Sequence, residues 1–146
     1  MVVYLRPYHL FAVIRQLATG RTEEDFNGIP EITRKIRNNS GTGIEVVRVF
    51  DDACNLCAMR KKSPNGCIWG EKYICPSAKN IRRAREVDKS NDEIIRDLGV
   101  WVGTRMEAID ILRLAARKRP FHYSKNKPWQ NQYESGIKIL FSRDVR

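Results

Sequence analysis

Residues 51–76 read DDACNLCAMRKKSPNGCIWGEKYICP and hold all four cysteines of the chain, Cys54, Cys57, Cys67 and Cys75. Their spacing is C-x2-C-x9-C-x7-C-P, which places four thiolate ligands in one loop of a size that can surround a single metal centre. The two residues between Cys54 and Cys57 let one backbone turn direct both sulfurs at the same ion. We therefore predict that residues 51–76 form a metal-binding loop.

Three interpretations of the cysteines remain open from the sequence. A C-x-x-C pair with further cysteines, the last followed by Pro76, is typical of ferredoxin-type ligation, so an iron–sulfur cluster of the 4Fe-4S type is favoured. A zinc site usually has two C-x-x-C pairs, whereas Cys67 and Cys75 stand alone, and zinc is therefore the alternative. The third interpretation is two disulfides or four buried free thiols.

Length and composition are typical of one globular domain spanning residues 1–146. The chain is 42% hydrophobic and 30% charged, and no apolar run approaches the roughly 20 residues that a bilayer span needs. The first 17 residues are interrupted by Arg6, Pro7, His9 and Arg15 and lack a small-residue cleavage site, so we expect no signal peptide. We expect a cytoplasmic protein without membrane contact, in a compartment where clustered cysteines more often bind metal than form disulfides.

The formal net charge of +10 predicts a surface that attracts anions. An acidic redox or enzyme partner is the first expectation, and nucleic acid is possible. Many equally basic proteins bind no particular acidic partner, and this alternative also stays open.

The C-terminal segment over residues 111–146 is basic, and residues 111–133 contain no acidic residue. Cations there alternate with aromatic rings, a composition that suits single-stranded nucleic acid because cations neutralise phosphates and exposed rings stack on bases. The alternative is a basic helix end followed by rings that pack on the core. The candidate contact residues for nucleic acid or a partner are Arg82, Arg83, Arg117, Lys118, Arg119, Lys125, Lys127 and Trp129.

Hydrophobic periodicity predicts an α+β fold, a mainly helical single domain with a small β-sheet and the cysteine-rich loop at one end. Strands are expected over residues 2–5, 44–50 and 137–141, and helices are expected to begin at Pro7, Thr22, Ser90 and Thr104. Ser90 and Thr104 each begin a capping-box pattern, with glutamate three residues later. His9 lies in the first turn of the first helix, where it either makes hydrogen bonds near the core or serves as an auxiliary metal or proton-transfer group.

Two segments carry a family resemblance: residues 5–10, Leu-Arg-Pro-Tyr-His-Leu, and residues 51–57, Asp-Asp-Ala-Cys-Asn-Leu-Cys. With the helix between them, they resemble an uncharacterised prokaryotic family considered to bind iron–sulfur clusters, domain of unknown function 1284. The resemblance covers the first half of the chain. It departs at Ala12, where the family tends to have a cysteine, and after Cys75, where the family tends to have a further cysteine cluster. The resemblance implies a cofactor and no particular reaction.

Two functions follow from these observations. The first is a small basic cytosolic iron–sulfur protein with an electron-transfer, sensing or accessory role, since four cysteine ligands leave no open iron for substrate. If only three cysteines bound the cluster, an enzyme would be possible. The second is a zinc-stabilised nucleic-acid-binding domain. A conventional hydrolase is poorly supported, because neither His9 nor His122 lies in a nucleophile or metalloprotease motif.

Overall fold

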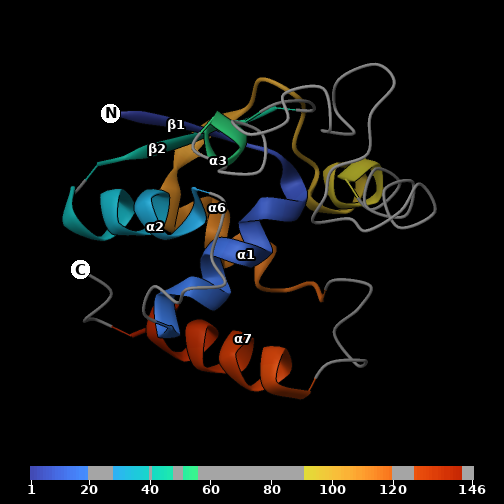
Figure 1. Ribbon diagram of the computed structural model, residues 1–146. Coiled ribbons are helices and arrows are strands. Elements are labelled where there is room, and N and C mark those ends of the chain that lie inside the picture. The colour runs from blue at the N-terminus through green and yellow to red at the C-terminus, as the bar shows by residue number, and fades with distance from the viewer. Residues whose placement is uncertain (20–27, 40, 48–50, 56–90, 120–126, 143–146) are drawn as a thin grey trace.

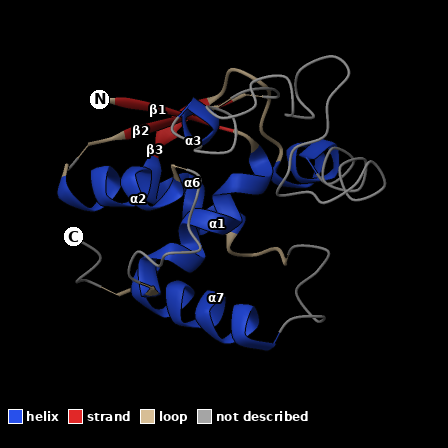
Figure 2. Ribbon diagram, viewed as in Figure 1, coloured by secondary structure: helices blue, strands red, loops and turns tan. Residues whose placement is uncertain are grey.

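The computed structural model of the protein describes residues 1–19, 28–39, 41–47, 51–55, 91–119 and 127–142. These residues form a three-stranded sheet with helices on one side of it (Figures 1 and 2), which confirms the predicted mainly helical α+β fold. The strands are β1 (Val2–Leu5), β2 (Gly43–Val46) and β3 (Arg105–Glu107). The helices are α1 (Pro7–Ala18), α2 (Ile29–Asn38), α3 (Asp52–Asn55), α6 (Ala108–Ala115) and α7 (Lys127–Leu140), and residues 91–98 are also helical.

The sheet has the order β1-β2-β3. β1 pairs with β2 in parallel, with Leu5 opposite Val46, and β2 pairs with β3 in antiparallel register, with Ile44 opposite Met106. Parallel strands cannot be joined by a tight turn, and the chain between β1 and β2 accordingly passes through α1 and α2. Among the described strands, β1 therefore lies at one edge of the sheet.

Helix α1 is the centre of the described core. It packs against α2, α6 and α7, and residues on most of its circumference are buried, among them Leu10, Phe11, Val13 and Ile14. A helix that is apolar on most sides belongs in an interior. The sheet and α7 lie on opposite sides of α1 in Figure 2. Phe11 meets the fully buried ring of Tyr133 from α7 in an edge-on arrangement, with ring centroids 6.0 Å apart.

Several sequence predictions agree with the described elements. β1 and the start of α1 at Pro7 are confirmed, as is the helix over residues 91–98, which ends at Gly99 with a φ of 66°. The predicted second helix is described only from Ile29, with Gly28 as the N-cap and Pro30 in the first turn. Its predicted beginning at Thr22 lies outside the described residues.

The helix predicted to begin at Thr104 was placed wrongly. Residues 105–107 form β3, and α6 begins only at Ala108, with no side-chain cap from Glu107. The Thr104 hydroxyl instead accepts the backbone N–H of Trp101 at 2.8 Å. Pairing of residues 105–107 with β2 therefore outweighed a capping pattern that is purely local.

Two of the predicted strands, over residues 137–141 and 44–50, also differ from the structure. The expected strand over residues 137–141 is wrong, because residues 127–140 form the single helix α7. Its buried residues Tyr133, Gly136 and Leu140 recur at helical spacing, which the short alternation of Ile137 and Ile139 obscured. The strand expected over residues 44–50 ends at Val46, and residues 48–50 lie outside the description.

The contact between α1 and α7 depends on Gly136. A Cβ atom at this position would overlap the backbone carbonyl of Ile14, so only glycine allows the two helix backbones to approach this closely. Gly136→Ala usually stabilises a helix by about 0.5–1 kcal/mol. We expect the opposite sign here, a loss of about 1–3 kcal/mol in the free energy of unfolding, because the helices must move apart.

The measurement is urea unfolding monitored by far-UV circular dichroism. The control is Ser135→Ala on the exposed side of the same helix, where the hydroxyl donates only to the Asn131 carbonyl. This control should change the free energy of unfolding by less than about 0.5 kcal/mol. Stabilisation by Gly136→Ala would show that the helices do not meet at this position.

Candidate functional site

Asp51 lies at the beginning of the predicted metal-binding loop, and its carboxylate joins two helix ends. Its Oδ2 accepts the backbone N–H of Arg6, which precedes α1, and its Oδ1 accepts the backbone N–H of Cys54 in α3. The two N–O distances are 2.9 and 3.0 Å, and the Asp51 side chain is fully buried. A helix N-terminus has unpaired N–H groups and a positive dipole end, so a carboxylate is favoured there.

His9 and Arg6 complete the surroundings of this carboxylate. His9 Nδ1 lies 2.5 Å from Asp51 Oδ2, and His9 Nε2 lies 3.2 Å from Arg6 Nη2. Arg6 Nε is 3.8 Å from the same carboxylate oxygen. Because Arg6 can only donate, this network assigns the proton of a neutral His9 to Nδ1, which donates to Asp51. Both ring nitrogens of His9 are then engaged, and an auxiliary metal role would require one of these contacts to break.

The electrostatics of Asp51 are set by opposing effects. Burial alone would raise the pKa of its carboxyl, but its interactions with His9, followed by those with Arg6, lower the pKa well below its usual range. Asp51 is therefore ionised at neutral pH although it is out of contact with water. We call Arg6, His9, Asp51 and Cys54 the Asp51 cluster.

Two neighbouring side chains satisfy further backbone groups of β1 and α1. Asp52 Oδ2 accepts the N–H of Tyr4 in β1 at 2.9 Å, and Asn91 Oδ1 accepts the N–H of Tyr8 in the first turn of α1 at 2.8 Å. Arg6, the N-cap residue of α1, does not cap the helix with its own side chain. The loop beginning at residue 51 is thus attached to β1 and α1 by consecutive aspartates.

Cys54 is the one predicted metal ligand within the described residues. Its side chain is buried, and the residue is 6% exposed. Burial, followed by the charge of Asp51, raises the pKa of the Cys54 thiol to about 12, against the opposite effect of Arg6. Without a cation the thiol is protonated at neutral pH and is a poor nucleophile. A bound metal would favour the thiolate directly.

The remaining predicted ligands, Cys57, Cys67 and Cys75, lie outside the described residues. Within the part of the chain that the structure describes, no three His, Cys, Asp or Glu side chains come together as a metal site. The chemistry of the donor set nevertheless fits a soft metal or an iron–sulfur cluster, because all four candidates are cysteines. The burial of Cys54 also fits a centre that is shielded from water.

The predicted basic contact residues are only partly described. Arg82, Arg83 and Lys125 lie outside the described residues, while Arg117 and Lys127 are exposed. Lys118 pairs with Asp97 at 2.8 Å, and Arg119 pairs with Glu134 at 3.0 Å. The Arg119 guanidinium also lies 5.4 Å from the ring centroid of Tyr133.

The ring of Trp129 stacks on the ring of Tyr133, with ring centroids 5.0 Å apart and ring planes 14° apart. Trp129 is partly buried and packs against the core. The fold therefore gathers Arg119 and Trp129 around Tyr133, and Lys118 turns toward Asp97. No helix among the described residues is long and apolar enough to cross a membrane.

The roles of Asp51, Arg6 and Asn91 did not follow from the sequence. The available signal was weak, since Asp51 three residues before Cys54 is an ordinary N-cap pattern. Its contact with Arg6 joins residues 45 apart in the chain and has no local pattern. The buried position of the Asp51 carboxylate could therefore be identified only from the structure.

Asp51→Asn should destabilise the protein strongly. The substitution keeps the shape of the side chain but removes the charge that compensates buried Arg6, and we expect a loss of about 3–5 kcal/mol in the free energy of unfolding. The matched control is Asp52→Asn, which retains an oxygen for the Tyr4 N–H and should cost less than about 1 kcal/mol. Urea unfolding of both variants measures these values, and equal losses would contradict the special role of Asp51.

The stabilisation by Asp51 should also depend on pH. Its pKa in the folded protein is lower than in the unfolded chain, where it is about 4. The contribution is therefore complete above about pH 4 and is lost as the pH falls further toward the folded pKa. The difference in unfolding free energy between wild type and Asp51→Asn should shrink below about pH 4 in urea titrations at a series of pH values. A difference that grows in acid would contradict this assignment.

Comparison with known proteins gives no relative from which a function could be transferred. No protein-family model, no curated protein and no solved structure matches this chain significantly. The resemblance to domain of unknown function 1284 therefore stays a prediction.

Proposed function

We propose that the protein is a small metal-binding protein whose loop over residues 51–76 holds an iron–sulfur cluster through Cys54, Cys57, Cys67 and Cys75. The observation that carries this proposal is the placement of Cys54. It is a buried thiol at the entrance of the loop, and its backbone is fixed by the Asp51 carboxylate. Anchoring the first ligand reduces the conformational freedom that the loop must lose when it surrounds a metal.

The two segments that resemble domain of unknown function 1284 contact each other, and this supports the proposal. Arg6 and His9 come from the first segment, and Asp51 and Cys54 come from the second. The polar residues of the two segments together hold the start of the cysteine loop against β1 and α1. A family relationship based on these motifs is accordingly part of the proposal.

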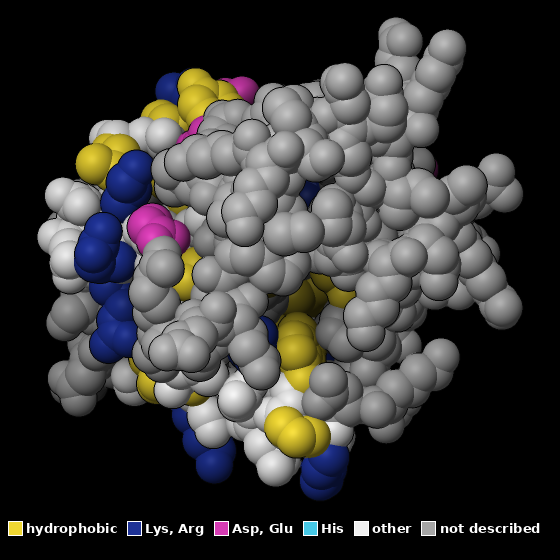
Figure 3. Space-filling model, in the orientation of Figure 1, with side chains coloured by type: hydrophobic (Ala, Val, Ile, Leu, Met, Phe, Trp, Pro, Cys, Tyr) yellow, Lys and Arg dark blue, Asp and Glu magenta, His cyan; other side chains and the backbone are white. Residues whose placement is uncertain are grey.

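The chemistry of four cysteine ligands favours electron transfer, sensing or an accessory role over direct catalysis. When each iron is bound by a protein thiolate, no coordination position is left for substrate. We propose that the protein acts in the cytoplasm and docks an acidic redox or enzyme partner. Its net charge of +10 supports such a partner, and in Figure 3 lysine and arginine side chains line the edge of the molecule over α2 and α7.

The alternative is a zinc-stabilised nucleic-acid-binding domain. The contacts described above favour it less, because Lys118 and Arg119 pair with acidic residues and Trp129 stacks on Tyr133. Exposed rings and unpaired cations would suit single-stranded nucleic acid better. Steeply salt-dependent binding to RNA or DNA would support this alternative, and its absence would remove it.

The metal content decides between these functions. We expect protein purified without oxygen to contain iron and acid-labile sulfide in about equal amounts, near four of each per chain for a 4Fe-4S cluster, with broad visible absorption. Cys54→Ser and Cys57→Ser should each lose most of this iron and absorption, because an alkoxide ligand replaces thiolate poorly. The control Ala58→Ser introduces a serine beside Cys57 but keeps all four thiols, and it should retain the cluster.

Other results have equally definite meanings. One zinc ion per chain in a colourless sample would remove the iron–sulfur proposal and favour the zinc alternative. Metal-free protein with four titratable thiols, or with two disulfides, would contradict both metal-binding functions.

A further inference from the structure

β3 forms the second edge of the sheet among the described strands, because only β2 pairs with it. The carbonyl of Thr104 and the N–H of Ala108 are both hydrogen-bonded to the backbone at the two ends of β2, each at 2.9 Å. The backbone groups of successive strand residues point to opposite sides, so those of Arg105 and Glu107 point away from β2. An edge of this kind can pair with a further strand.

The side chains on this edge have charges of opposite sign. Arg105 and Glu107 are both exposed, and they lie on the same face of the sheet because they are two residues apart in one strand. A charged strand edge usually prevents pairing with another chain. Two like charges would repel a second copy of β3. One positive and one negative residue instead complement a second copy that runs antiparallel.

Arg105 already has one acidic neighbour within its own sheet. Its Nη2 lies 2.9 Å from Glu45 Oε1 in β2, which orients the guanidinium across the outer face of the sheet. The guanidinium has five N–H donors, and the contact with Glu45 leaves some of them for a second carboxylate.

A turn with two exposed apolar side chains precedes β3. It closes through the Thr104 N–H, which donates to the Trp101 carbonyl at 2.9 Å, and Gly103 in this turn has a φ of 94° and donates its N–H to β2 at 2.8 Å. Trp101 is 79% exposed and Val102 is 55% exposed. The backbone that presents Trp101 to solvent is therefore fixed. A tryptophan held in this way is typical of the energetic centre of a protein interface.

We propose that the protein forms a symmetric dimer in which the β3 strands of two copies pair antiparallel, with Met106 at the two-fold axis. In this register Arg105 of each copy lies opposite Glu107 of the partner subunit, and the backbone groups of these two residues pair. The two three-stranded sheets become one continuous sheet. This interaction goes beyond the proposed metal-binding function and does not depend on it.

The register also uses the other features of the edge. Arg105 lies in one row between Glu45 of its own chain and Glu107 of the partner subunit. Because the strands are antiparallel, the turn before β3 in one copy lies beside the beginning of α6 in the other, where Trp101 can be covered. A short strand and one turn are much smaller than a standard interface, so we expect a weak dimer with a dissociation constant of about 10–100 µM.

The test is sedimentation velocity of the full chain, as purified with its metal, at low salt and at chain concentrations from about 1 to 500 µM. Wild type should change from monomer to dimer over this range. Arg105→Glu places two carboxylates opposite each other, and Glu107→Arg places two guanidinium groups opposite each other. Each variant should therefore weaken the dimer at least about tenfold, since both symmetric pairs change from attraction to repulsion.

A mixture of the two variants separates repulsion from damage to the strand. In an equimolar mixture, a chain with Arg105→Glu and a chain with Glu107→Arg have opposite charges in both cross-strand pairs. The mixture should therefore form a heterodimer with an affinity within about fivefold of wild type.

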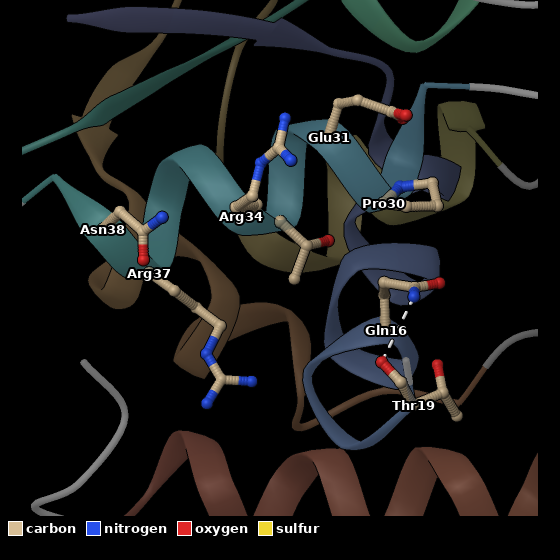
Figure 4. A pocket seen from close by; sticks show the side chains of 8 residues that line it. Gln16, Thr19, Pro30, Glu31, Arg34, Arg37 and Asn38 are labelled. Atoms are coloured by element: carbon tan, nitrogen blue, oxygen red, sulfur yellow. Dashed lines mark hydrogen bonds between the residues drawn. The ribbon is translucent and has the colours of Figure 1, made fainter. Parts of the chain in front are cut away.

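Arg34→Glu is the control for net charge. Arg34 is exposed on α2, where it lines a cavity between α2 and the end of α1 (Figure 4), and it is not part of the sheet. Its substitution changes the net charge as much as Arg105→Glu does. It should weaken the dimer by less than about threefold, as expected for an exposed and screened charge.

The role of the tryptophan is tested by Trp101→Ser, with Phe141→Ser as the control. Both side chains are exposed in the single chain, so both variants should remain folded, which far-UV circular dichroism checks. Trp101→Ser should weaken the dimer at least about tenfold. Phe141 follows α7, on the other side of α1 from the sheet, and Phe141→Ser should change the affinity by less than about twofold.

Four outcomes would overturn the proposal. Wild type that stays monomeric at every concentration would exclude the dimer, and a mixture no stronger than the separate variants would show that the substitutions only damage the strand. Equal losses in Arg105→Glu and Arg34→Glu would indicate a general effect of charge. A dimer that is unaffected by the variants at positions 101, 105 and 107 would have another interface. Metal analysis of the same samples tests the proposed metal centre separately, so the two failures are distinguishable.

Discussion

A buried carboxylate costs several kcal/mol unless its surroundings replace water, and this requirement governs the arrangement around Asp51. The replacement comes from three parts of the chain: the backbone before α1, the His9 ring within α1, and the backbone of α3. β1, α1 and the beginning of the cysteine loop must therefore be in place together for the charge to be tolerated. The first ten residues in this way determine where the loop starts.

Helix α1 connects this constraint to the rest of the core. Its N-terminus is capped by side chains from Asp51 and Asn91, while its middle is in backbone contact with α7 at Gly136. A displacement of α7 would thus be passed to α1 and then to the groups around Asp51. The position of Cys54 therefore depends on the packing of the whole described core. Such rigidity suits a ligand that has to be held in place while the remaining ligands of a loop assemble around a metal.

The sequence was informative where structure is locally determined. The apolar stripe after Pro7 predicted α1, and the acidic start with Gly99 as terminator predicted the helix over residues 91–98. It failed at residues 105–107 and 137–141, where pairing with β2 and packing of α7 on α1 overrule short patterns. The Asp51 cluster could not be predicted, because its contacts join residues more than 40 apart. The cysteine spacing, by contrast, is a sequence signal whose three later members lie outside the described residues, so the metal site stays a prediction.

The electrostatics around Cys54 also bear on the proposed centre. Four thiolates around an oxidised cluster or a zinc ion carry a net charge of about −2, and ionised Asp51 adds another negative charge nearby. Without compensation, this proximity would weaken metal binding, as the raised pKa of the Cys54 thiol already indicates. Arg6 opposes this effect, because its buried guanidinium is the positive group that favours the thiolate of Cys54. A strongly basic chain can thus hold an anionic centre beside a buried aspartate, since Arg6, a compensating charge among the described residues, is fixed within the core, where salt screens it much less than at the surface.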